Sequence, residues 1–192
     1  VPPDTPGAPF FERSVRWVTP HVFSELGRND EARASFSALM ARGLDDLPPE
    51  NSRCTRISAL FSLGDACATV GDDGSAGLIY DALNPYRDQW QVIGWGAAVF
   101  GSAHYMLGTL RSVQRRWHAA DEHFEEALAL HDRENAICAQ ARALYQYARA
   151  VRRRGRKVDR SRADRLARRA LAITDEHGLR GIAVRLRSLD SV

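Results

Sequence analysis

Apolar residues recur every three or four positions through most of this chain, the spacing that places them on one face of an α-helix. Ile57, Leu60 and Gly64 follow this spacing in one segment, which Gly71 would end because glycine tolerates the left-handed conformation. The periodic segments, taken with their capping and breaking residues, predict eight helices, over residues 9–26, from 29 or 30 through 39, 51–70, 75–83, 92–114, 118–131, 135–154 and 161–177. We expect a short further helix within 178–192.

The segment 107–128 carries a pattern of small and large residues that recurs along the chain. Gly108 and Ala120 would let two helices approach closely, and Phe124 and Ala127 would share one face of the second helix. Alanines equivalent to Ala120 are spaced by 44, 44 and 43 residues, at positions 32, 76, 120 and 163. This pattern is typical of tetratricopeptide hairpins, here with helices longer than those of the 34-residue repeat. It predicts an all-α fold, a right-handed superhelix of four helical hairpins with a period of about 44 residues.

The repeats divide the chain into a linker over 1–8, a tetratricopeptide-like domain over 9–179 and a C-terminal capping segment over 180–192. The chain begins with Val1 rather than Met, from which we expect it to be part of a longer polypeptide. In the first hairpin Thr19 and Pro20 stand where Leu-Gly is expected, and Pro20 should kink its helix. An exposed apolar face on this hairpin would promote a homodimer.

Alignment of the four hairpins predicts an aromatic ladder on the concave face of the stack. The aromatic residues at the equivalent position of each first helix are Trp17, Phe61, Tyr105 and Tyr145. Polar groups flank them, three residues before or four residues after, at Ser14, Ser58, Ser102, Arg142, His21, Asp65, Thr109 and Arg149. Aromatic side chains bury large areas and polar ones fix orientation, so these positions predict a groove for a protein or peptide segment. The alternative is that the aromatics pack between hairpins and the groove is empty, or is filled by another part of the parent protein.

Charge is distributed unevenly along a chain whose formal net charge is +3: residues 149–192 hold fourteen basic residues and five acids. The densest basic run, a candidate phosphate-binding patch, comprises Arg152, Arg153, Arg154, Arg156 and Lys157. A nucleic-acid-binding module is therefore the alternative function. We favour solvated or paired charges instead, because no aromatic residue interleaves with this run. The pairing would join the acids 121, 122, 125 and 126 to Arg165, Arg168 and Arg169.

Other sequence features limit the functions that this chain can have. The sequence has no apolar run long enough to span a membrane and no secretory signal. The three cysteines are scattered, which fits reduced thiols in the cytoplasm. Phosphate-loop, nucleophile-elbow and zinc-protease motifs are missing, and His118 and His123 are spaced poorly for a metal. We therefore expect a protein that is not an enzyme and has no cofactor and no metal site.

Two short segments carry a family resemblance: EHFEEAL at 122–128 and YQYAR at 145–149. With the surrounding helices, about Phe10 to Leu179, they resemble the C-terminal helical-repeat region of large actinobacterial signalling proteins. In that family a tetratricopeptide-like region follows an AAA/STAND-type ATPase module, and some members carry an adenylate cyclase domain or a LuxR-type helix-turn-helix. The resemblance implies a cytoplasmic sensor or scaffold arm that binds a protein segment or an effector and couples it to an attached ATPase or transcription module.

Overall fold

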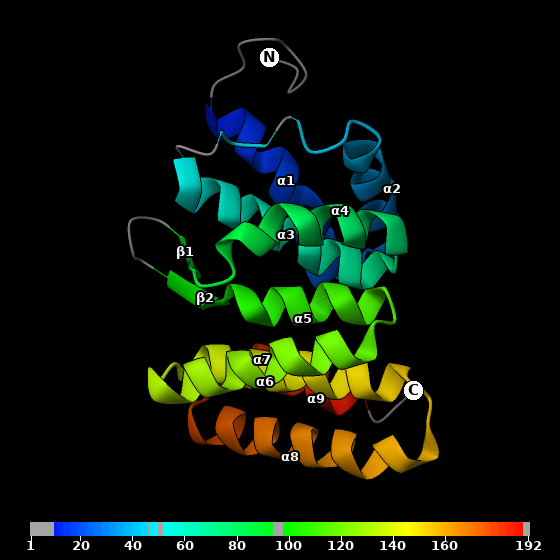
Figure 1. The fold of residues 1–192 in the computed structure, drawn as a ribbon, viewed down its shortest axis with the longest axis vertical. Helices are drawn as coiled ribbons and strands as arrows, with labels where there is room; N and C mark the ends of the chain where they lie inside the picture. Colours follow the sequence, from blue (N-terminus) through cyan, green and yellow to red (C-terminus); the bar gives the residue numbers. More distant parts are fainter. Residues whose placement is uncertain (1–9, 46, 50–51, 94–97, 190–192) are drawn as a thin grey trace.

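The computed structural model describes residues 10–45, 47–49, 52–93 and 98–189, and this part of the chain is mostly helical (Figure 1). Its α-helices are α1 (Phe10–Glu25), α2 (Asn29–Met40), α3 (Arg53–Val70), α4 (Asp73–Leu83), α5 (Ala103–Val113), α6 (Trp117–Arg133), α7 (Ile137–Arg153), α8 (Arg160–Glu176) and α9 (Arg180–Ser188). Short 3-10 helices, η2 (Asn84–Tyr86) and η3 (Lys157–Asp159), follow α4 and precede α8. The strands are β1 (Trp90–Ile93) and β2 (Ala98–Ser102). Within the described ranges no helix is both long and apolar enough to cross a membrane.

The helices from α1 to α8 are layered in chain order along the molecule, and α9 folds back beside α7 and α8 (Figure 1). Each helix contacts the next one along the chain, and the odd-numbered helices also contact one another, α1 with α3, α3 with α5, α5 with α7 and α7 with α9. The buried apolar residues form a large cluster that extends from α1 to the start of α8 and a smaller cluster among α7, α8 and α9.

Small residues bring the helices together where the sequence predicted close approach. A side-chain carbon at Gly108 would lie 3.1 Å from the ring of Phe124 and 3.2 Å from the carbonyl oxygen of Ala120. The alanines at positions 32, 76, 120 and 163 are all fully buried. Gly64 permits a second close contact, because a side-chain carbon there would lie 2.4 Å from the sulfur of Met106.

The helix ends follow local chemistry. α3 ends at Gly71, which has φ 81°, in the left-handed region that favours glycine. Asp72 caps α4, since its side chain accepts a hydrogen bond from the backbone N–H of Gly74. α1 continues through Pro20. The predicted helix boundaries therefore agree with the structure to within about two residues, with one exception.

The prediction of a single helix over 92–114 is wrong in its first half. β1 and β2 form an antiparallel hairpin there, and the helix begins only at Ala103. Gly101 has φ 148°, a conformation that side chains rarely adopt, and the pairing shifts beside it so that Phe100 has no partner in β1. Valine and phenylalanine favour a strand and glycine disfavours a helix, so the local sequence agrees with the hairpin.

Candidate functional site

A cavity of about 190 Å³ lies on the side of the stack formed by the odd-numbered helices. Residues from α1, α3, α5, α7 and α9 line it, together with Phe100 of β2. Five of the residues predicted for the groove meet here: His21, Asp65, Tyr105, Arg142 and Tyr145. The fold therefore gathers these five predicted side chains, from four successive odd-numbered helices, around one space.

Asp65 of α3 connects two neighbouring helices within this cavity. The hydroxyl of Tyr105 on α5 donates a hydrogen bond of 3.1 Å to one carboxylate oxygen of Asp65. The other oxygen lies 3.8 Å from Nδ1 of His21 on α1. Burial raises the pKa of Tyr105, so its hydroxyl remains a donor, and burial lowers the pKa of His21 despite the charge of Asp65. His21 is therefore neutral at pH 7.

The four ladder aromatics do not share one environment. Trp17, Phe61 and Tyr105 are 6%, 1% and 1% exposed and belong to the main core cluster. The rings of Phe61 and Tyr105 lie 6.2 Å apart, between centroids, and are tilted by 42°. Tyr145 is half-buried and lines the cavity. The alternative interpretation, in which the aromatic side chains pack between hairpins, thus describes Trp17, Phe61 and Tyr105. The accessible part of the face formed by the odd-numbered helices is mainly polar.

The remaining predicted groove residues lie outside the cavity. The Ser58 hydroxyl donates to the carbonyl of Val92 in β1 at 3.4 Å, and the Thr109 hydroxyl donates within its own helix. Ser102 is buried at the start of α5. Arg149 donates to the carbonyl of Ala68 at 3.2 Å. Ser14 falls in α1, and its side chain lies outside the described part of the structure.

Six residues of the cavity are missing from the sequence-based prediction: Glu25, Phe100, Gln146, Gly181, Ile182 and Arg185. Glu25 of α1 and Arg185 of α9 form an ion pair that links the first helix to the last. Phe100 lies under the guanidinium group of Arg142, 4.8 Å from the ring centroid. Ile182, Ala183 and Leu186 have helical spacing, which is the sequence signal for α9, but the return of this helix to α1 depends on the tertiary fold.

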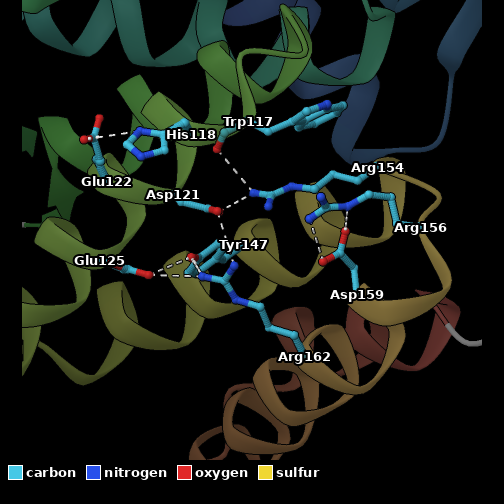
Figure 2. Close-up of polar contacts among 10 residues, drawn as sticks. All are labelled: Trp117, His118, Asp121, Glu122, Glu125, Tyr147, Arg154, Arg156, Asp159 and Arg162. Atoms are coloured by element: carbon cyan, nitrogen blue, oxygen red, sulfur yellow. Dashed lines mark hydrogen bonds and ion pairs between the residues drawn. The ribbon is translucent and has the colours of Figure 1, made fainter.

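A charged network joins α6, α7 and α8 beside the basic run (Figure 2). The Arg154 side chain is 4% exposed, pairs with Asp121 and donates to the carbonyl of Trp117 at 3.3 Å. Arg162 of α8 donates to Asp121 at 3.2 Å and to Glu125 at 3.0 Å. Burial opposes ionisation of Asp121, but the two arginines hold its pKa below the usual value. Arg154 is therefore part of the helix packing rather than of the surface.

The predicted pairing between α6 and α8 exists, but through other residues. Arg162 supplies the guanidinium group that meets the α6 acids. Arg165, Arg168 and Arg169 are exposed, and no ion pair within the described ranges joins them to α6. Arg162 lies in the first turn of α8, where its guanidinium group reaches Asp121 and Glu125 of α6.

The other members of the basic run differ in their partners. Arg152 pairs with Asp164 at 3.1 Å, and Arg156 pairs with Asp159 at 2.7 Å. Arg153 and Lys157 are exposed. Arg149, Arg152, Arg153 and Arg156 together line a second, larger cavity of about 720 Å³.

The described residues contain no group of three or more histidine, cysteine, aspartate or glutamate side chains placed to hold a metal ion. His104 and His123 approach each other at 3.0 Å, between their Nδ1 atoms, and Tyr80 is hydrogen-bonded to the other nitrogen of His123. Burial, reinforced by His104 and nearby arginines, lowers the pKa of His123 to about 4. Burial raises the pKa of Cys67 to about 12, so its thiol is a poor nucleophile.

Comparison of the chain with protein-family models, with curated proteins and with solved structures found no match in any of the three. Function is therefore inferred from the residues and their geometry.

Proposed function

We propose that this chain is a tetratricopeptide-like interaction module, a right-handed superhelix of four hairpins that binds a protein segment on its odd-numbered helices. The observation that supports this proposal is the convergence of His21, Asp65 and Tyr145 on one cavity, from helices far apart in the sequence. A face built from successive equivalent helices suits an extended ligand, because each repeat adds a neighbouring contact.

The cavity has the size and chemistry to anchor one side chain of a bound segment. At about 190 Å³ it is smaller than the 300–1,000 Å³ typical of small-molecule sites. Arg142 stacks on Phe100 and has no carboxylate partner within the described residues, so it can receive a carboxylate or a backbone carbonyl. Tyr145 offers an adjacent aromatic surface. An acidic or carbonyl-presenting segment fits this arrangement best.

In a longer protein, the bound segment would belong either to a separate partner or to another domain of the parent. In both cases the chain would act as a regulatory arm that has no catalytic activity of its own. The family resemblance implies that this arm is coupled to an attached ATPase or transcription module. The proposal of nucleic-acid binding is weaker, because Arg152, Arg154 and Arg156 each already pair with a carboxylate.

The homodimer expected from the sequence remains a prediction. Four large apolar side chains of the first hairpin are exposed along one side of α1 and just beyond it: Val15, Val18, Val22 and Leu26. Their spacing of three or four residues places them in one stripe, which two copies of the chain could cover by packing together.

Site-specific photocrosslinking tests the proposed groove. A benzoylphenylalanine at Tyr145 should capture a protein from a lysate of the source organism, or a domain of the parent protein when that is expressed. The matched control carries the same group at His118 on α6, whose side chain is 91% exposed. We expect products from position 145 only, and their loss when Arg142→Ala is added. Identical products from both positions, or none from position 145, would contradict the proposal.

A further inference from the structure

Five of the nine residues that line the larger cavity are arginines. It lies between the C-terminal half of α7, the loop that follows it, the start of α8 and Leu189 beyond α9. Its volume of about 720 Å³ is within the range of small-molecule sites. Five guanidinium groups, those of Arg149, Arg152, Arg153, Arg156 and Arg160, surround the space, and Asp164 is the acid among the lining residues.

Carboxylates of the described residues neutralise only part of this charge. Asp164 pairs with Arg152, and Asp159 pairs with Arg156. Arg149, Arg153 and Arg160 have no carboxylate partner within the described ranges. Partial desolvation and then the neighbouring charges of Arg149 and Arg115 lower the pKa of Arg153, so like charges surround this guanidinium group. An anion placed among these groups would relieve that repulsion.

The local helix ends account for some of these arginines but not for all of them. Cations stabilise the C-terminus of a helix, which explains Arg152 and Arg153 in the last turn of α7. Arg156 follows that helix, and Arg160 is the first residue of the 17-residue α8, where the dipole disfavours a cation. The first turn of α8 contains no acid and no side-chain cap. The N-cap residue, Asp159, is an acid, and its carboxylate pairs with Arg156.

We propose that this cavity binds a compact polyanion that carries two or three linked phosphate groups. Guanidinium groups recognise phosphate oxygens with paired hydrogen bonds, and five of them around one space match a group with several charges. The concave site, which Val151 and Leu189 also line, suits a small anion better than the extended backbone of a duplex. The same chemistry would recognise free polyphosphate or the phosphate chain of a nucleotide.

This site is separate from the proposed groove, although both use α7. Tyr145 lines the smaller cavity and Arg149, one helical turn further on, lines the larger one. The proposal of an anion site is therefore independent of the proposal that a partner binds in the groove.

Calorimetric titration of the full chain with sodium pyrophosphate and sodium triphosphate tests the proposal. The test variant is Arg153→Gln/Arg160→Gln, because both side chains are exposed and make no hydrogen bond within the described residues. The matched control is Arg168→Gln/Arg169→Gln, which makes the same charge change on exposed positions of α8 outside the cavity. Circular dichroism establishes that each variant is folded.

We expect saturable binding of triphosphate that weakens about tenfold for each cavity arginine removed and changes less than about twofold in the control. Tighter binding of ATP than of triphosphate would identify a nucleotide as the ligand, and equal binding would identify the phosphate chain alone. Equal losses in both variants would show attraction by net charge only and would overturn the proposal. The absence of binding to the wild type, or binding of duplex DNA that triphosphate does not displace, would overturn it as well.

Discussion

His131 should make the stability of this protein depend on pH in a way that one substitution can isolate. The side chain lies on α6, is 1% exposed, and packs against Trp90 of β1 with 5.2 Å between ring centroids. Its Nε2 accepts a hydrogen bond of 3.0 Å from the backbone N–H of Ser102, at the junction of β2 and α5. An accepting nitrogen carries no proton, so the folded state requires neutral imidazole.

Burial lowers the pKa of His131 from 6.5 to about 4 in the folded state. Between these two values the unfolded chain binds a proton that the folded chain does not, so stability is complete above pH 6.5 and falls as the pH decreases toward 4. At 1.36 kcal/mol for each pKa unit, acidification from pH 7.5 to pH 5 should remove about 2 kcal/mol of unfolding free energy through this residue.

The assay is urea denaturation at pH 7.5 and pH 5, followed by circular dichroism, for the wild type and His131→Gln. Glutamine does not titrate, and its side-chain oxygen can accept the same hydrogen bond from Ser102. Other histidines, including His123, contribute equally to both proteins and cancel in the comparison. We expect the variant to lose about 2 kcal/mol less than the wild type on acidification. Equal losses, or an NMR titration of His131 with a pKa near 6.5, would refute the reasoning.

Two further predictions concern helix packing. Gly64→Val should destabilise the chain by about 2 kcal/mol in chemical denaturation, because the new side chain would overlap Met106, whereas Gly181→Ala meets no atom within 4 Å and should cost nothing. Unchanged stability of Gly64→Val would show that the helices move apart easily. Arg154→Ala should lower the unfolding free energy by about 3 kcal/mol, since it leaves Asp121 half-buried and partly unpaired, while the exposed Arg165→Ala should change it by less than about 0.5 kcal/mol. Similar midpoints for these two arginine variants would contradict the role assigned to the network.

The sequence by itself determined the helical character of the chain and most of its helix boundaries. These depend on residues close to one another, such as Gly71 ending one helix and Asp72 capping the next. The sequence also indicated where small residues are required for two helices to approach closely, and Gly108 and Ala120 do meet beside Phe124. A helix period of 3.6 residues and the conformational preferences of glycine and aspartate are sufficient for conclusions of this kind.

The candidate sites could be predicted only in part. Equivalent positions on successive helices indicated His21, Asp65 and Tyr145, which line one cavity, but periodicity cannot show how deep a position lies. Trp17 and Phe61 have the same helical phase as Tyr145 and are buried, because neighbouring helices and the core cover them.

Only the tertiary structure decided the contacts between distant residues. The β1–β2 hairpin is stabilised by His131, about thirty residues later, through the backbone of Ser102. The pairing of Arg185 with Glu25 spans nearly the whole chain. A basic residue can pair with any acidic residue that lies close to it in space. The sequence alone does not give the distance between two such residues. Packing of one helix on another sets it, and packing thereby determines which arginines are paired within the fold and which face a cavity.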